Sequence, residues 1–353
     1  MKRQVFQFSI SYAIVIALLI SGHLALADSE KRKTINKSYQ VSSSTDLTFS
    51  NSFGKMHVET WDKNEVKVNI EVVVRASSDE RAQKLLDKIT IDIDDNNPKS
   101  ELSYRTSINN NNSGRSSSFE VNYNLSVPKT SNLTLKNSFG DTYLDDHSGE
   151  TELDVQYGNL KAGKLSGECD VKLSFGSGFS EIDAMPSGNL KVSYSKLSVE
   201  EMGNVDVNSQ FSTFTNESAD RINLIAKYGE VEFGKLNYLD ADVNFSGFEL
   251  DEIHKSIVLD IDYGGSIDIG IKKTVELVDI KSSFGPVNIE LDEGVNGTVE
   301  AKMSFCDLRY DEEKINFNKI IKEHTSSEYE GKIGNGNGTK FKIVSKYGNV
   351  RIR

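Results

Sequence analysis

Cysteine is scarce in this chain, with only Cys169 and Cys306 among 353 residues. A disulfide needs Cα atoms within about 7 Å of each other. In the repeat described below, the two cysteines lie about seven coils apart at about 4.8 Å per coil, far beyond that reach. We therefore expect two unpaired thiols, with Cys306 as a small residue behind Phe305, and a stability that does not depend on covalent bridges.

The chain also lacks an excess of positive charge. Its 41 Lys and Arg against 53 Asp and Glu give a net charge of −12. An acidic balance argues against nucleic acid as a partner and against simple adsorption to anionic lipid. Ordinary solubility is sufficient reason for this charge.

A long apolar run is missing after the first residues. At the N-terminus, Lys2 and Arg3 precede an apolar segment at 13–20, and Ala25-Leu26-Ala27 forms a small-x-small cleavage site. This pattern predicts an export signal over 1–27, whose removal takes the net charge from −12 to −14. An anchoring helix is the weaker alternative because polar residues shorten the apolar run. No cysteine follows the cleavage site, so we expect no lipoprotein anchor, and we expect a location in the periplasm, at the cell surface or outside the cell.

Catalytic and cofactor motifs are missing as well. The sequence has no G-x-S-x-G, no phosphate-binding loop, no Cys/His zinc spacing and no Gly-Gly-x-Gly-x-Asp calcium repeat. Accordingly we predict no catalytic, cofactor-binding or metal-binding residue and no cofactor. Because β-helices also host carbohydrate-active enzymes, paired carboxylates still need weighing. The candidates are Asp240 with Asp242, Asp260 with Asp262, and Asp251 with Glu252.

In the repeat described below, successive coils stack on one another, and this stacking would bring Asp242 near Asp260. The alternative is that these carboxylates are outward residues alternating with core positions such as Ala241, Val243, Leu259 and Ile261, and this is the ordinary case for Asp.

What the sequence does have is a repeat. An aromatic residue followed by a small one recurs every 17–21 residues, and the last copy falls 42 residues, or two intervals, after the one before it. A period this short and regular indicates stacked supersecondary units. The pairs begin at Phe139, Tyr157, Phe175, Tyr194, Phe211, Tyr228, Phe245, Tyr263, Phe284, Phe305 and Tyr347.

The flanks of each pair give the unit its structure. Apolar residues stand six, four and often two positions before the aromatic, and three and five positions after it, as around Tyr228. Alternation of period two indicates a strand with one buried face. The spacing from the aromatic is even before it and odd after it, so one extra residue is inserted at the pair. Such an insertion indicates a bulge or corner, and we expect the small residue, usually Gly, to supply its backbone angles. These features predict an all-β, single-stranded β-helix (β-solenoid) of roughly 18–21-residue coils.

The aromatics themselves are expected to form one ladder along a corner, with neighbouring rings stacked in an offset arrangement. Phe and Tyr alternate from Phe139 to Tyr263. An aromatic at core spacing usually packs the core, so we expect the rings to point inward rather than toward a ligand.

The N-terminal third differs from the rest. Residues 47–58 hold one unit of the repeat around Phe53, and strands are predicted at 65–74, 89–93, 101–106 and 119–127. One short helix is predicted at 79–88, because Ser78 can cap it and Ala82, Leu85 and Leu86 form an apolar stripe. The polar run 109–114 reads as a loop. Since solenoid ends expose strand edges that need covering, we interpret 28–130 as an N-terminal β-rich cap and 131–353 as the β-solenoid repeat domain.

Several strings in this region resemble a known family. Asn51-Ser52-Phe53-Gly54, His57-Val58-Glu59-Thr60-Trp61-Asp62, the helix, Val127-Pro128 and Leu133 to Asp141 are similar to the bacterial putative-adhesin domain family of unknown function. The resemblance covers most of the mature chain. It implies an exported protein of the single-stranded β-helix, head-domain type, and it supplies no catalytic motif.

Three functions remain. The leading interpretation is a non-catalytic exported adhesin, or surface or envelope binding protein, that uses an extended β-solenoid surface to hold a glycan, protein or other envelope component. The alternative is a periplasmic envelope scaffold or stress-linked accessory protein. The third is a β-helix carbohydrate-active enzyme. Fold alone does not choose among them.

Overall fold

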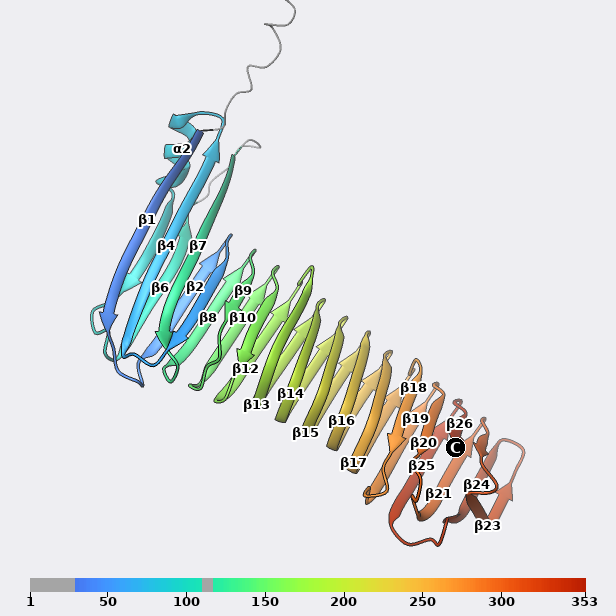
Figure 1. The fold of residues 1–353 in the computed structure, drawn as a ribbon. Helices are drawn as coiled ribbons and strands as arrows, with labels where there is room; N and C mark the ends of the chain where they lie inside the picture. The colour runs from blue at the N-terminus through green and yellow to red at the C-terminus, as the bar shows by residue number, and fades with distance from the viewer. Residues whose placement is uncertain (1–28, 110–116) are drawn as a thin grey trace, which may run out of the picture. The chain divides into compact units, whose positions relative to one another are not determined.

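The computed structural model describes residues 29–109 and 117–353. The predicted export signal at 1–27 lies outside these residues, as does nearly all of the polar run 109–114. The described residues form an all-β structure with one helix (Figure 1). None of them form a helix with the length and apolar character of a membrane span.

The strands follow one another along almost the whole described chain, and all of them join one hydrogen-bonded sheet. The helix is α2 (Asp79–Leu86). The strands are β1 (Ser29–Gln40), β2 (Asp46–Ser52), β3 (Met56–Trp61), β4 (Glu65–Ala76), β5 (Ile89–Asp94), β6 (Glu101–Ile108), β7 (Ser117–Pro128), β8 (Asn132–Ser138), β9 (Thr142–Leu144), β10 (Thr151–Gln156), β11 (Leu160–Lys164), β12 (Glu168–Ser174), β13 (Phe179–Ser193), β14 (Lys196–Gln210), β15 (Thr213–Lys227), β16 (Glu230–Asn244), β17 (Gly247–Asp262), β18 (Ile267–Ile271), β19 (Leu277–Ser283), β20 (Val287–Leu291), β21 (Gly297–Ser304), β22 (Leu308–Tyr310), β23 (Ile315–Lys322), β24 (Ser326–Ile333), β25 (Thr339–Lys346) and β26 (Val350–Ile352).

Parallel pairing between neighbouring repeats organises the region from β8 to β20. Leu153 lies opposite Leu135 of the repeat before it and opposite Val171 of the repeat after it. From β13 to β17 the two halves of each repeat merge into a single strand of 15 or 16 residues, which runs from one aromatic-small pair to the next. Side-by-side strands of this kind are visible along this part of the chain in Figure 1.

The predicted core positions are buried. Around Tyr228, Ile222, Leu224 and Ala226 before the ring and Val231 and Phe233 after it are each at most 2% exposed. Because one extra residue is inserted at the aromatic-small pair, the apolar residues of both flanking segments face the same interior. This alternation is the main source of the fold's stability, since burial of apolar surface is the dominant favourable term in folding.

The C-terminal repeats do not follow sequence order, contrary to the expectation of a linear series of coils. Strand β25 is inserted between β19 and β21, so that Phe341 lies opposite both Val278 and Val299. In the same way β26 pairs with β20 and β22. Strands β23 and β24 form an antiparallel hairpin, and β24 pairs antiparallel with β21. The hairpin thus covers the free side of β21, and β23, which pairs with β24, is the strand beyond it.

The N-terminal third has the predicted elements. Strands β4, β5, β6 and β7 cover the four predicted ranges. Ser78 caps α2, its Oγ accepting a hydrogen bond from the Arg81 backbone N–H at 3.4 Å, and Ala82, Leu85 and Leu86 are buried. Strand β1 was not predicted, because it has no fully buried residue and hence no apolar alternation.

Two compact units result. Among the described residues, one combines 29–33, 72–90, 108–109 and 117–120, and the other combines Thr34–Glu71, Ile91–Ser107 and Val121–Arg353. In the smaller unit, α2 is accompanied by ion pairs of Lys31 with Asp79 and of Arg75 with Glu30. The larger unit contains the aromatic-small repeats and all the sites described below.

Candidate functional site: an exposed aromatic ladder

The aromatic residues of the repeat form one continuous stack, here called the aromatic ladder, and each ring is a rung. Adjacent ring centroids lie 4.7–5.0 Å apart, and their planes differ by only 2–14°. The predicted ladder is thereby confirmed. Its order in space is Phe53, Phe139, Tyr157, Phe175, Tyr194, Phe211, Tyr228, Phe245, Tyr263, Phe284, Tyr347 and Phe305.

The expectation that these rings pack the core is wrong. Every rung is 39–55% exposed, so the ladder lies on the surface of the repeat. The reason is the backbone. Each rung has a φ of 50–63°, the left-handed region, and no other non-glycine residue of the described part has a positive φ. A left-handed residue at the corner turns its side chain away from the interior, whereas the core residues two positions before it and three positions after it, such as Ala226 and Val231 around Tyr228, continue to face inward.

The small residue behind each rung has a different role from the one expected. None of these glycines has a positive φ. Instead the backbones of successive repeats approach closely there: a Cβ on Gly140 would overlap the carbonyl of Gly54, and one on Gly158 would overlap that of Gly140. Glycine is used for this close approach. Where Ser takes the position, its hydroxyl bridges repeats, as Ser212 Oγ accepts from the Ser195 N–H and donates to the Gln210 carbonyl.

Each rung combines a backbone cost with a stacking gain. A left-handed conformation costs an L-residue roughly 1–2 kcal/mol, and a stacked aromatic pair returns about 0.5–1.5 kcal/mol. These two terms are of similar size, the burial of about half of each ring adds to the favourable side, and Gly would form the same corner without the strain. Strained backbone that recurs at every repeat is a reason to look for a function at those residues.

A hollow of about 670 Å³ lies beside the middle of the ladder. Tyr194, Phe211 and Tyr228 line it, together with the small residues behind them and the first residues of the following strands. Those strand residues are Lys196, Thr213 and Glu230, which lie in register on adjacent strands. The hollow therefore spans several repeats and runs in the direction of the stack.

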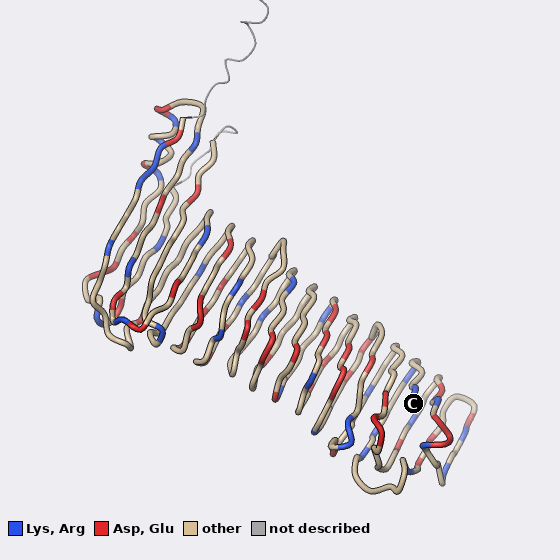
Figure 2. Tube along the Cα trace, viewed as in Figure 1, with Lys and Arg blue, Asp and Glu red and all other residues tan. Residues whose placement is uncertain are grey.

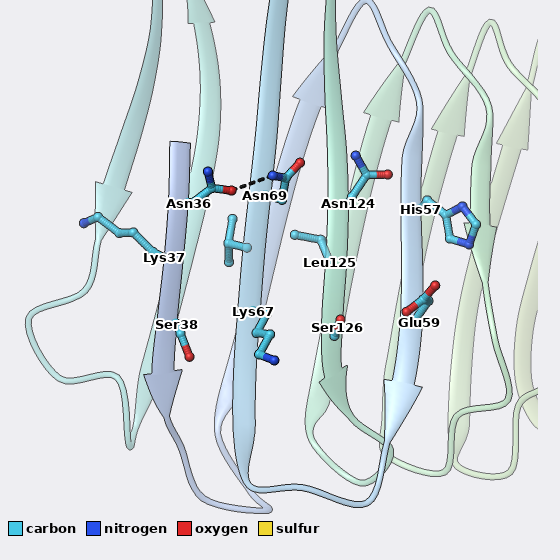
Figure 3. A pocket seen from close by; sticks show the side chains of 11 residues that line it. Asn36, Lys37, Ser38, His57, Glu59, Lys67, Asn69, Asn124, Leu125 and Ser126 are labelled. Carbon is cyan, nitrogen blue, oxygen red and sulfur yellow. Dashed lines mark hydrogen bonds between the residues drawn. The ribbon is translucent and has the colours of Figure 1, made fainter. Parts of the chain in front are cut away.

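A second hollow, of about 480 Å³, lies on the outer face of β1, β4, β7 and β3 (Figure 3). Polar side chains line it, including Asn36, Lys67, Asn124 and His57. Some of them are already engaged: Asn69 donates to Asn36 at 2.5 Å, and the Lys67 ammonium lies 5.0 Å from the Trp61 ring. This hollow combines amide, hydroxyl and charged groups with the apolar residues Val68 and Leu125.

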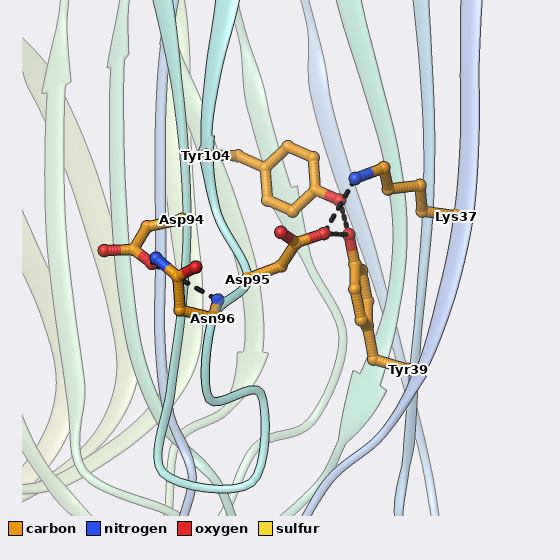
Figure 4. A network of polar contacts seen from close by, with 6 residues as sticks. All are labelled: Lys37, Tyr39, Asp94, Asp95, Asn96 and Tyr104. Atoms are coloured by element: carbon orange, nitrogen blue, oxygen red, sulfur yellow. Dashed lines mark hydrogen bonds and ion pairs between the residues drawn. The ribbon is translucent and has the colours of Figure 1, made fainter.

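A polar network joins β1 to Tyr104 of β6 and to Asp95, which directly follows β5 (Figure 4). The Tyr39 hydroxyl contacts the hydroxyl of fully buried Tyr104 at 2.6 Å and donates to Asp95 Oδ2 at 2.7 Å, which also accepts from Lys37 at 2.7 Å. Loss of hydration raises the pKa of Tyr39 to about 12, and the hydrogen bond from Lys37 lowers the pKa of Asp95. The network is satisfied internally, so we assign it a structural role.

The carboxylates singled out in the sequence are only partly brought together. Asp242 and Asp260 are direct partners on β16 and β17, as predicted, but Asp240 lies opposite Val258 and Asp262 opposite Asn244. All four are exposed outward residues. Figure 2 marks the Asp and Glu positions along the chain in red. The four carboxylates alternate with buried Ala241, Val243, Leu259 and Ile261, which is the alternative set out above.

Asp251 and Glu252 lie in different surroundings. Asp251 is exposed. Glu252 binds Lys272 at 3.1 Å and contacts His254 at 3.2 Å, and the hydrogen bond from Lys272 lowers the pKa of Glu252. A carboxylate held ionised in this way is a poor general acid. Over 29–109 and 117–353, no group of three or more His, Cys, Asp or Glu residues is arranged to hold a metal. Cys169 and Cys306 are both free thiols.

Comparisons with known proteins add descriptions at low similarity. No family model and no curated protein matches the sequence. Among solved structures, the chain is similar to a putative cell adhesion protein from Clostridium sporogenes, at 11% identity over 92% of this chain and 98% of that one, with a TM-score of 0.20. It is also similar to two proteins from Parabacteroides distasonis. One is a putative adhesin, at 12% identity over 91% and 97% of the two chains, and the other a putative lipid binding protein, at 11% identity over 92% and 97%, each with a TM-score of 0.29.

Two of these three neighbours are described as adhesion proteins, as is the family that the sequence resembles. The head-domain type has no counterpart among their descriptions. Identities and TM-scores this low do not carry a function to this chain.

Proposed function

We propose that the protein is an exported, non-catalytic binding protein of the adhesin kind, which holds an extended component of a cell surface or envelope along its aromatic ladder. In this proposal the repeats form a single-stranded β-solenoid over 131–353, residues 28–130 cap it, and 1–27 direct export. The observation that carries the proposal is the ladder itself: twelve strained, half-exposed rings in one row.

The physical argument concerns what such a row can do. Soluble proteins usually keep exposed apolar patches small, and a contiguous row of aromatic side chains is typical of an interaction surface. Because neighbouring rungs cover one another's faces, the ladder offers ring edges along its length. A partner must therefore be long enough to contact several rungs, which favours a polymer over a small molecule.

The test is binding of the purified mature protein to isolated cell envelopes and to intact cells. Replacing Tyr194, Phe211 and Tyr228 by Ser is expected to abolish most binding. A matched control replaces Ile225, Val258 and Val344 by Ser, because these outward apolar residues are 39–47% exposed but do not belong to the ladder. The control is expected to bind like the unmodified protein.

Equal binding by the ladder variant and the unmodified protein would contradict the proposal, provided that both melt at similar temperatures. Fractionation of cells, combined with protease treatment of intact cells, tests whether the protein is exported and whether it reaches the cell surface. Reproducible cleavage of a polysaccharide by the purified protein, lost in Asp242→Asn or Asp260→Asn, would favour the enzyme instead.

A further inference from the structure

Phe and Tyr alternate in the order in which the rings are stacked, and not in the order in which they occur along the chain. In the sequence, Tyr263 is followed by Phe284, Phe305 and then Tyr347, which breaks the alternation. In space, β25 brings Tyr347 between Phe284 and Phe305, and the alternation of Phe and Tyr continues to the last rung. Duplication of a sequence unit does not produce this result. The alternation is a property of the finished surface.

The tyrosine hydroxyls are not needed for stacking. The ring centroids of Phe53 and Phe139 lie 4.8 Å apart with an angle of 6° between the ring planes, and those of Phe139 and Tyr157 lie 4.7 Å apart with an angle of 3°. The hydroxyls also make no hydrogen bond within the described part of the chain, in contrast to the engaged hydroxyls of Tyr39, Tyr104 and Tyr123. They are polar groups directed at the surroundings from every second rung. The five residues are Tyr157, Tyr194, Tyr228, Tyr263 and Tyr347.

The spacing of these hydroxyls follows from the sheet. Rungs are 4.7–5.0 Å apart, so hydroxyls on alternate rungs recur at roughly 10 Å, twice the inter-strand distance. In an extended β-1,4-linked glycan, each sugar is turned over relative to the one before it. The same edge and the same hydroxyl groups therefore recur at every second sugar, at this same distance. Such a polymer would place one sugar on each rung and one disaccharide on each Phe-Tyr pair.

The charge beside the ladder selects an uncharged polymer. The residue before each rung is Ser, Gln or Asn at nine of the twelve positions, and the exceptions are Lys227, Asp262 and Lys346. This strip on one side of the ladder is nearly neutral, and on the other side the hollow is lined by residues of opposite sign, Lys196 and Glu230. Amide and hydroxyl groups match the hydroxyl groups of a neutral glycan, whereas an anionic or cationic polymer finds no continuous row of opposite charge.

We infer that the aromatic ladder binds an uncharged, extended β-1,4-linked polysaccharide lengthwise, with the tyrosine hydroxyls in register with alternate sugars. This inference rests on the proposed binding function and names its ligand class. The hollow beside Tyr194, Phe211 and Tyr228 takes the substituents on one edge of the glycan. Phe rungs contact the C–H groups of one sugar, and Tyr rungs hydrogen-bond the next.

The experiment measures binding of the mature protein to β-1,4-linked oligosaccharides of glucose and of N-acetylglucosamine, from four to about ten sugars long. Affinity is expected to rise with each added disaccharide, since each covers two more rungs. An α-1,4-linked glucose oligomer of equal length has the same composition but a curved chain, and it is expected to bind at least tenfold more weakly. Polygalacturonate supplies an anionic comparison and is expected not to bind.

The variant that isolates the hydroxyls is Tyr194→Phe with Tyr228→Phe, which keeps every ring and removes two hydroxyl groups. A net hydrogen bond of about 0.5–1.5 kcal/mol corresponds to a loss of roughly twofold to tenfold for each hydroxyl. The matched control is Phe211→Tyr with Phe245→Tyr, which adds hydroxyls on the wrong rungs and is expected to gain nothing. Unchanged affinity in the first variant, or equal affinity for α- and β-linked oligomers, would overturn the inference.

The two proposals fail in different ways. If the ladder variant loses envelope binding but the unmodified protein binds none of the β-1,4-linked oligomers, the ligand class is wrong and the binding function stands. If the ladder variant retains envelope binding, both proposals are rejected. Thermal melting of each variant shows whether a loss of binding reflects a loss of fold.

Discussion

The larger unit carries two rows of aromatic side chains that follow opposite rules. The inner row, Phe214, Phe233 and Phe248, is at most 2% exposed, and its rings meet at 52–70° with centroids 5.8–6.1 Å apart. The outer row is the ladder, with nearly parallel rings at the strand spacing. Inner rings adopt whatever tilt fills the interior, because cores are close-packed. Outer rings have no such constraint, so the stacked backbone sets their geometry, and their exposure leaves them available to a partner.

The largest expected effect comes from the inner row. Phe233→Ala removes a buried ring and leaves a cavity, which typically costs about 3–5 kcal/mol of the free energy of unfolding. Because neighbouring repeats stabilise one another, the unfolding transition should also become less cooperative. Urea titration followed by circular dichroism measures both. A loss below about 1 kcal/mol would show that the inner ring contributes no more than an exposed one.

The ladder is expected to be less sensitive, and to prefer a different replacement. Phe245→Ala loses stacking on Tyr228 and Tyr263, about 0.5–1.5 kcal/mol for each contact. Phe245→Gly loses the same contacts but relieves the left-handed strain at φ 51°. We therefore expect the Gly variant to be at least as stable as the Ala variant, the reverse of the order at ordinary strand positions. Lower stability for Gly than for Ala would contradict the strained-corner account.

A smaller effect is expected at Tyr39, whose pKa is raised to about 12. A tyrosine with a raised folded-state pKa contributes stability that is complete below its unfolded value of about 10 and is lost as the pH rises through the folded value. Stability should therefore fall between about pH 10 and pH 12. Tyr39→Phe should make this fall shallower, without removing the contribution of Tyr104, whose pKa is also raised by burial. Urea midpoints across this pH range provide the measurement, with Tyr310→Phe as a control outside the network.

The smallest effect is expected at the paired carboxylates. Asp242 and Asp260 lie directly opposite each other on adjacent strands, where like charges are mildly unfavourable. Asp242→Asn should leave the protein as stable as before or stabilise it by a few tenths of a kcal/mol. Raising the salt concentration should remove the difference, because both groups are exposed. A clear destabilisation would reveal a structural or binding role for this pair.

Much of the repeat is predictable from the sequence because each strand position is either apolar or polar in a regular alternation. Alternation of apolar residues specifies which side of a strand is buried, and the positions around Tyr228 were assigned correctly for that reason. The direction of the rungs could not be read in the same way. A large aromatic at a regular interval usually indicates core, and nothing in the residue type announces a positive φ. One signal was available: the extra residue inserted at each pair required a special backbone conformation, and it was assigned to the glycine instead of the aromatic.

Two other features escaped prediction for physical reasons. Strand β1 is held by main-chain pairing with β4 and by polar contacts such as those of Tyr39, and neither leaves an apolar pattern. The placement of β25 between β19 and β21 depends on non-local pairing, which a spacing of two intervals of 21 residues does not encode. The alternation of Phe and Tyr is the one sequence signal for this placement. Along the chain the alternation stops after Tyr263, whereas in the stacked ladder it continues.

The inserted position of β25 and β26 also has a consequence for how the chain reaches its final form. Residues 277–310 are synthesised before 339–352, yet β19 and β21 acquire their common neighbour only when that last segment arrives. Assembly in chain order would therefore leave β19 without its second neighbour until β25 enters between β19 and β21. A deletion of 339–352 would remove an interior layer of the stack rather than shorten its end, and would leave β21 to β24 without their attachment to the preceding repeats.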